Sequence, residues 1–101
     1  MKVRLHPEAR VELREARKWY YERSPLSATA FAHAVDHAVA RIREAPTRYP
    51  LAEHGARKIV IQRFPFNVFY RPSPDEIVIV AVAHQKRRPG YWSNRTAVEL
   101  E

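Results

Sequence analysis

A single change in hydrophobic spacing, near the middle of the chain, constrains its fold more than any other feature. Between residues 7 and 45, apolar side chains recur three or four positions apart, which is the repeat of one helix face. From residue 57 onward they recur at every second position, which is the repeat of a β-strand. A short polar–apolar alternation over residues 2–5 precedes both patterns. This order predicts an α+β fold in which a short N-terminal strand is followed by helices and then by a sheet.

Proline and serine positions divide the helical region into two helices. Pro7 follows His6 and suits the first turn of a helix, where its missing N–H is not needed. Ser24 can cap a second helix that opens at Pro25, and Pro46 stops that helix. The expected core faces are Ala9, Leu13, Ala16 and Tyr20 in the first helix and Ala28, Phe31, Val35, Ala38 and Ile42 in the second. Because almost no linker separates the helices, we expect an antiparallel helical hairpin.

Three strands are predicted after a loop at residues 46–56, which contains two prolines and a glycine. Residues 58–62 and 66–71 alternate in polarity, and residues 72–75 form a turn signal. Residues 77–83 are continuously apolar, which is typical of a strand buried on both faces. Short connections between these strands favour a three-stranded antiparallel meander with one face against the helices. If the alternation holds, the other face is partly open and carries Lys58, Arg63 and Arg71.

Length and charge limit the class of protein. A chain of 101 residues suits one domain spanning residues 1–101. Its net charge of +7 is concentrated in residues 54–98, which hold eight Lys or Arg against two Asp or Glu. This asymmetry favours an acidic partner, either nucleic acid or an acidic protein segment, although basic residues also simply keep small proteins soluble. The chain has no cysteine, no secretory signal and no apolar run near the roughly 18 residues of a membrane span, so a cytoplasmic protein without a membrane partner is expected.

Two further patterns are better explained by ordinary structure than by a site. His33 and His37 have the spacing of a zinc-binding helix, but Ala34 replaces the glutamate of the metalloprotease motif and no third ligand is nearby. The run Trp19-Tyr20-Tyr21 could stack nucleic-acid bases, yet such a cluster more often closes a core. We expect no metal. With only two glycines and no phosphate-binding loop, we also expect no cofactor.

Motifs distributed along nearly the whole chain resemble those of the RelE/ParE superfamily of toxins. They are His6-Pro7-Glu8-Ala9, Trp19-Tyr20, Ser24-Pro25 leading to Phe31, the segment 63–71, Val82-Ala83-His84, Lys86-Arg87-Arg88-Pro89, and Trp92 with Arg95. Each piece alone is common, but the ordered set is fairly specific. The fold of that family, a helical hairpin on an antiparallel sheet, agrees with the fold that hydrophobic spacing predicts independently.

The resemblance implies the toxin of a type II toxin–antitoxin pair, with a cognate antitoxin encoded beside it. The C-terminal pattern is more similar to the ParE-type and plasmid-stabilisation branch, whose members inhibit growth by binding DNA gyrase and are not enzymes. The alternative is a RelE-like endoribonuclease, whose partners are the ribosome and the mRNA that it cleaves. A third possibility is a nontoxic relative that only binds a partner protein or nucleic acid.

Each alternative implies its own site residues. RNA cleavage needs an acid, a base and cations near the scissile phosphate. By position the RelE-like residues that match are Arg63, Arg87 and Tyr91, with His84 as a further acid or base. Gyrase binding needs an aromatic and basic anchor, for which the candidates are Arg87, Arg88, Trp92 and Arg95.

The antitoxin is expected to lie over an apolar groove beside the helical hairpin and over the basic sheet face. The candidate residues for contact with antitoxin or nucleic acid are Lys58, Arg63 and Arg71. For the candidates for RNA cleavage and for gyrase binding, a purely structural explanation is also possible. In it, Tyr91 and Trp92 pack the C-terminal tail and the arginines are solvated or bind the antitoxin.

Overall fold

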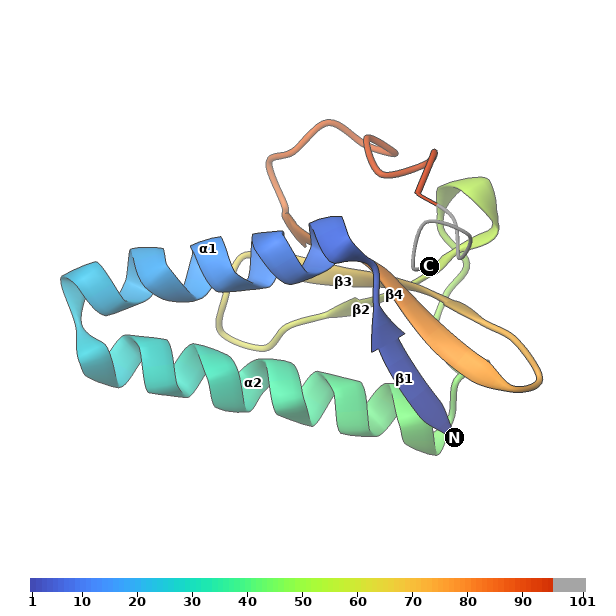
Figure 1. Ribbon diagram of the computed structural model, residues 1–101, viewed down its shortest axis with the longest axis horizontal. Helices are drawn as coiled ribbons and strands as arrows, with labels where there is room; N and C mark the ends of the chain where they lie inside the picture. The colour runs from blue at the N-terminus through green and yellow to red at the C-terminus, as the bar shows by residue number, and fades with distance from the viewer. Residues whose placement is uncertain (96–101) are drawn as a thin grey trace.

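A helical hairpin packs against one face of a four-stranded sheet in the computed structural model, which describes residues 1–95 (Figure 1). The elements in chain order are β1 (Lys2–Leu5), α1 (Pro7–Arg23), α2 (Pro25–Glu44), a 3₁₀ turn η1 (Glu53–Gly55), β2 (Arg57–Val60), β3 (Phe66–Pro72) and β4 (Glu76–His84). This arrangement confirms the predicted α+β class, with its N-terminal strand, its helical hairpin and its C-terminal strands. None of the helices within residues 1–95 is long and apolar enough to cross a membrane.

Local signals set the ends and the buried faces of both helices. The Glu8 N–H donates to His6 Nδ1 at 3.0 Å, and the Ser27 N–H donates to Ser24 Oγ at 3.3 Å, so each helix has a side-chain N-cap. Pro7 and Pro25 occupy the first helical positions, as predicted. The buried helix residues are Ala9, Ala16, Ala28, Phe31, Val35, Ala38 and Ile42, with Leu13 and Tyr20 partly buried against them. The predicted core faces are therefore confirmed.

Replacing Ser24 with alanine should lower the free energy of unfolding by about 1 kcal/mol, because the Ser27 N–H loses its side-chain partner. Urea unfolding followed by circular dichroism measures this loss. Ser27→Ala is the matched control, since it changes the same residue type in the same turn without removing the cap, and alanine favours helix. Equal unfolding midpoints for the two variants would show that the cap contributes nothing.

The sheet has the strand order β1-β4-β3-β2. Strands β2, β3 and β4 form the predicted antiparallel meander, and β1 pairs in parallel with β4. The pairing of β1 reaches only from Glu76 to Ile79 of β4, and the His6 N–H then donates to the Ile79 carbonyl at 2.8 Å. Beyond Ile79, β4 has no neighbouring strand on this side, and α1 passes there instead (Figure 1).

A bulge in β4 explains how one apolar run fills two cores. Phe69 pairs with Ala81 while the next residue, Tyr70, pairs with Ile79, so Val80 is an extra residue. Consequently Val80 and Ala81 both join the core on the face away from the helices. The helix-side core contains Ile77, Ile79 and Val82, and the opposite core contains Val78, Val80, Ala81 and Ala83. The prediction of a strand buried on both faces is confirmed.

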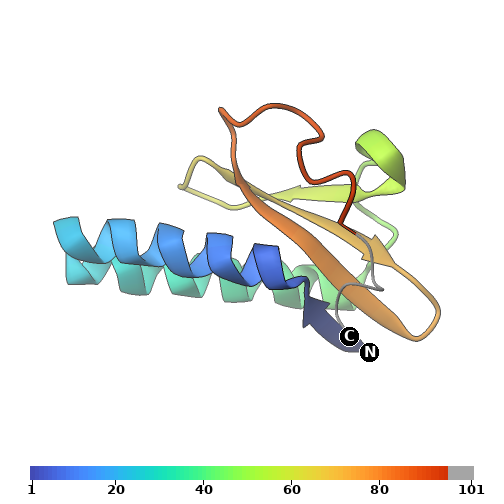
Figure 2. The same cartoon turned by 45° about the horizontal axis from the view of Figure 1, so that its top comes forward.

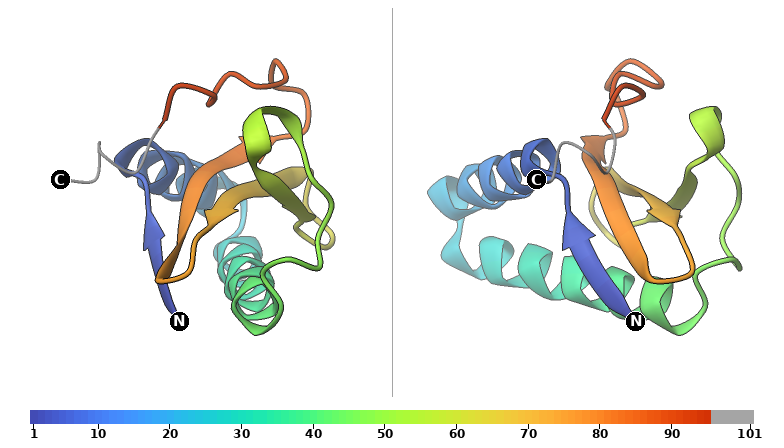
Figure 3. Two further views of the ribbon diagram at one scale, coloured as in Figure 1. Left: turned by 90° about the vertical axis from the view of Figure 1, so that its right-hand side faces the viewer. Right: turned by 45° about the vertical axis from the view of Figure 1, so that its right-hand side comes forward.

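The face away from the helices is partly open, as predicted, because the C-terminal segment covers only part of it and Lys58 lines a hollow there. Residues 85–95 cross it (Figures 2 and 3), and Trp92 packs there against Phe69, with ring centroids 4.7 Å apart. Arg71 is part of this cover: its guanidinium donates to the Arg95 carbonyl at 2.7 Å and lies 5.5 Å from the centre of the Trp92 ring. Strand alternation cannot show that a segment 24 residues farther along, at Arg95, folds back over the strand.

Candidate functional site

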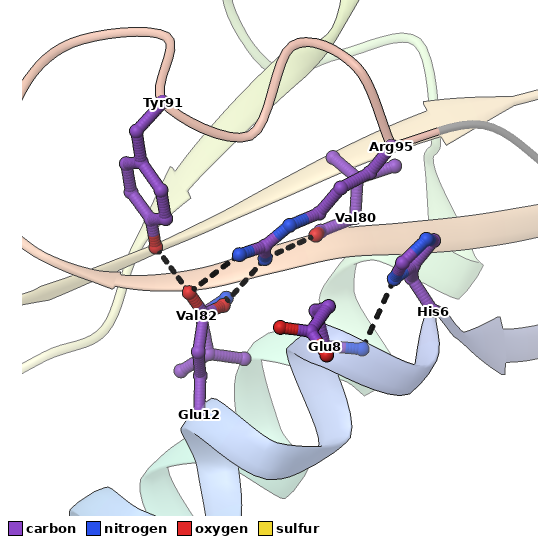
Figure 4. A network of polar contacts seen from close by, with 7 residues as sticks. All are labelled: His6, Glu8, Glu12, Val80, Val82, Tyr91 and Arg95. Carbon is purple, nitrogen blue, oxygen red and sulfur yellow. Dashed lines mark hydrogen bonds and ion pairs between the residues drawn. The ribbon is translucent and has the colours of Figure 1, made fainter.

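The Glu12 carboxylate, on α1, joins the free edge of β4 to the C-terminal segment (Figure 4). It accepts hydrogen bonds from the Val82 N–H at 3.0 Å and from the Tyr91 hydroxyl at 2.5 Å. Both terminal nitrogens of Arg95 donate to it, at 2.9 and 3.1 Å, and one of them also donates to the Val80 carbonyl at 3.0 Å. We call these three side chains the Glu12 network: Glu12, Tyr91 and Arg95. It satisfies strand groups that a neighbouring strand would otherwise bind.

Burial makes this network electrostatically strong. The side chains of Arg95 and Glu12 are only 12% and 13% exposed, so solvent screens their two-point ion pair weakly. Burial, reinforced by the hydrogen bond to Glu12, raises the pKa of Tyr91 far above its ordinary range. Burial lowers the pKa of Arg95, but the hydrogen bond and charge of Glu12 outweigh it, so the net shift is upward. At neutral pH Tyr91 is therefore a proton-bearing donor and Arg95 is a cation.

The turn after β4 presents two exposed arginines beside the network. It is tight: the Arg87 N–H donates to the His84 carbonyl at 2.9 Å, and the Lys86 N–H donates to His84 Nδ1 at 3.1 Å. The Arg87 guanidinium lies over the Tyr91 ring, with its central carbon 3.9 Å from the ring centre. Arg87 and Arg88 are both exposed to solvent. A basic loop thus rests on a tyrosine whose hydroxyl is held by Glu12.

A hollow of about 530 Å³, which we call the outer cleft, lies beneath this loop on the face away from the helices. Its polar lining comes from η1, β2, β3, β4 and the loop, and in it three cations outnumber one carboxylate: Glu53, Lys58, Asn67, His84, Gln85, Arg87, Arg88 and Tyr91. Cationic and amide groups in one concavity suit an anionic ligand. Of the predicted catalytic residues, the structure brings His84, Arg87 and Tyr91 together here.

Two other grooves flank the helices. The α1 groove, of about 420 Å³, is lined by Glu12, Glu15, Ala16, Trp19, Tyr20, Pro65, Phe66, Val82, His84 and Arg87. The α2 groove, of about 360 Å³, has an apolar floor and a basic rim of His33, His37, Arg41 and Arg63. Within residues 1–95 no three side chains are grouped to hold a metal.

The aromatic run of α1 divides between core and groove. Tyr20 packs against Phe31, Phe64 and Phe66, with ring centroids 5.1 to 6.4 Å away. Trp19 is 51% exposed, with the Arg23 guanidinium 3.5 Å from its ring centre, and Tyr21 is exposed as well. The prediction that this cluster closes the core is right for Tyr20 and wrong for the other two, because successive helix positions point about 100° apart.

The other predicted site residues are either distant from the outer cleft or buried in the structure around it. Arg63 lines the α2 groove, in a turn where its φ is +71°, so it does not join the other catalytic candidates. Trp92 is only 1% exposed, and Arg95 is bound to Glu12, so the expected four-residue exposed patch reduces to Arg87 and Arg88. Whether any of these residues contacts a target stays a prediction.

Sequence reasoning missed two residues. Glu12 and Asn67 are not among the candidates that the sequence offers, yet they contribute to the network and to the cleft. The sequence signal for Glu12 is weak: it lies directly beside the apolar stripe at Leu13 and Ala16.

Comparison with known proteins connects this geometry to a family. Residues 3–89 match the family model described as "ParE toxin of type II toxin-antitoxin system, parDE". Among solved structures, the chain is similar to "Chromosomal ParDE TA system from P. aeruginosa", with a TM-score of 0.72 and 19% sequence identity over 83% of this chain and 95% of that one. At that identity the likeness concerns the fold. No curated protein matches the chain by sequence.

Proposed function

Because this chain belongs to the ParE toxin family of type II toxin–antitoxin systems, we propose that it inhibits DNA gyrase by binding and that a cognate antitoxin neutralises it. The observation that supports binding is that Arg87 and Arg88 are exposed on an ordered loop, in which the Arg87 guanidinium packs on the Tyr91 ring. Arginine is enriched among the residues that dominate binding energy at interfaces. A loop that is already ordered loses less conformational entropy when it binds.

The contact residues of this proposal are fewer than the sequence suggested. Arg87 and Arg88 contact the target, whereas Trp92 and Arg95 support the loop from the outer core and from the Glu12 network. A buried tryptophan and a paired arginine offer little surface to a partner, but they determine where their neighbours lie.

The antitoxin site in this proposal is the α2 groove, beside the edge strand β2. Its floor includes Ala34, Ala38 and Ile59, and its rim carries Arg41 and Arg63. A segment that alternates acidic and apolar side chains would fill such a groove and pair with its rim. Lys58 and Arg71 are assigned lesser roles, since Lys58 lines the outer cleft and Arg71 is bound to the Arg95 carbonyl.

A ribosome-dependent endoribonuclease is the second candidate, and the outer cleft is the observation that favours it. Lys58, His84, Arg87 and Arg88 line one hollow, where they could surround a phosphate. Tyr91 fits this chemistry poorly, because its hydroxyl already donates to Glu12 and its raised pKa keeps it protonated. We therefore rank gyrase binding first.

A supercoiling assay with purified gyrase and the purified chain tests the proposal. We expect inhibition that the product of the adjacent small open reading frame reverses, together with growth arrest and intact transcripts in induced cells. In the same cells, mapping of transcript 5′ ends reports on the alternative. The alternative predicts new 5′ ends within translated codons, and these ends should disappear when translation is blocked. If they are found while gyrase supercoiling is unaffected, the target is mRNA and not gyrase. Normal growth with soluble expression would contradict both activities.

A further inference from the structure

Side chains, not a strand, complete the edge of β4 beyond Ile79. The Val82 N–H is bound by Glu12 and the Val80 carbonyl by Arg95, so the strand edge, α1 and the C-terminal segment meet at one carboxylate (Figure 4). That carboxylate accepts from three different residues, each donor lying within 3.1 Å.

A chain of contacts leads from this carboxylate to the exposed loop. The Tyr91 ring lies against the guanidinium of Arg87, at 3.9 Å, and that of Arg95, at 5.1 Å. Because Glu12 holds both the Tyr91 hydroxyl and Arg95, it fixes the ring on which Arg87 rests.

The backbone bonds of the loop do not provide this hold. The N–H groups of Arg87, Tyr91, Ser93 and Arg95 each donate to the carbonyl three residues earlier. Such bonds set the local shape of successive turns, and the one long-range backbone bond of the segment, from the Gln85 N–H to the Pro65 carbonyl at 2.8 Å, ties its start to another strand connection and not to α1. Trp92 anchors the loop to the sheet, where it packs in one apolar cluster with Phe69.

We infer that Glu12 is a positioning residue, which holds the Arg87-bearing loop in the geometry that growth inhibition requires. It reaches the target surface only through Tyr91 and Arg95, and it does not contact the target itself. This inference rests on the proposed role of the loop, but not on gyrase being the target.

The test compares Glu12→Gln with Glu22→Gln, the same change at an exposed position of the same helix. Glutamine keeps the size of the side chain but loses the charge that Arg95 and Tyr91 bind. We expect Glu12→Gln to raise the hydrogen-exchange rates of the Tyr91, Ser93 and Arg95 backbone amides on the order of tenfold, because charged hydrogen bonds are lost. The exchange rates of the β3 amides should stay unchanged and serve as the internal reference. The inhibitory dose in induced cells should rise by a similar factor. Glu22→Gln should change neither quantity.

A second variant, Tyr91→Phe, guards against a general loss of folding. It removes the hydroxyl but leaves the ring under Arg87 and the ion pair between Glu12 and Arg95, so we expect smaller changes in the same direction. Circular dichroism confirms that each variant is folded before its activity is compared.

The outcomes separate this inference from the proposed target. Faster loop exchange with unchanged growth inhibition would overturn the positioning role, as would unchanged exchange in Glu12→Gln. If the unmodified chain arrests growth but leaves supercoiling intact, the gyrase proposal fails while a joint change in exchange and growth still supports Glu12. If gyrase is inhibited equally by the unmodified chain and by Glu12→Gln, gyrase stands and the inference fails.

Discussion

Replacing both Arg87 and Arg88 with alanine is expected to abolish growth inhibition while leaving the fold intact. Both side chains are exposed, and Arg87 loses only its contact with the Tyr91 ring, so their removal should change the free energy of unfolding by about 1 kcal/mol or less. Removal of an interfacial arginine anchor typically costs 2 kcal/mol or more, so losing two should weaken inhibition at least about a hundredfold. The measurements are the inhibitory concentration in the supercoiling assay and colony formation after induction.

The matched control is Arg17→Ala with Lys18→Ala, which removes two positive charges from exposed positions of α1. If net charge alone attracts the partner, the two double variants should weaken inhibition equally, and added salt should abolish the difference from the unmodified chain. If the loop makes specific contacts, only the loop variant loses activity. Toxicity retained by the loop variant would remove Arg87 and Arg88 from the target surface.

The helices were predictable because their signals are local. A cap, a proline and a repeat of apolar residues lie within a few positions of one another, and Ser24, Pro25 and Ile42 behave as these patterns indicate. The meander was predictable for a similar reason, since short turns leave antiparallel pairing as the simplest connection.

The features that the sequence did not reveal depend on pairing between distant residues. Lys2 pairs with Glu76, so the neighbour of the first strand is β4, the last strand within residues 1–95. The bulge at Val80 shifts the facing of the residues that follow it, which regular alternation cannot anticipate. Trp92 looks like an exposed anchor in the sequence, because nothing near it in the chain shows that Phe69 lies beneath it.

For the candidate site, the sequence indicated residue types better than it indicated positions. Arg63, Arg87 and Tyr91 are suitable residues for RNA chemistry, yet the structure places Arg63 in the α2 groove and the other two beside the outer cleft. Glu12 escaped notice because a glutamate on an amphipathic helix is usually solvated. Its role depends on Arg95, which is 83 residues away along the chain.

Replacing Trp92 with alanine should lower the free energy of unfolding by about 3–5 kcal/mol, the usual range for a fully buried tryptophan. The Trp92 side chain is 1% exposed, and the centroid of its ring lies 4.7 Å from that of Phe69. The Arg71 guanidinium also lies over the Trp92 ring, 5.5 Å from its centre. A loss of this size is a large fraction of the 5–15 kcal/mol typical of a domain. Urea unfolding followed by circular dichroism gives the difference.

Trp19→Ala is the control, because it removes the other tryptophan from an exposed helix position. It should cost about 1 kcal/mol or less, most of it from the Arg23 contact. If Trp92→Ala is too unstable to purify, Trp92→Phe keeps an apolar ring in the outer core and should lie between the two. Equal midpoints for the Trp92 and Trp19 variants would mean that residues 85–95 do not cover the sheet in solution. A large loss of unfolding free energy for Trp92→Ala, together with a small loss for the Arg87 and Arg88 variant, would distinguish the residues that support the loop from those that contact the target.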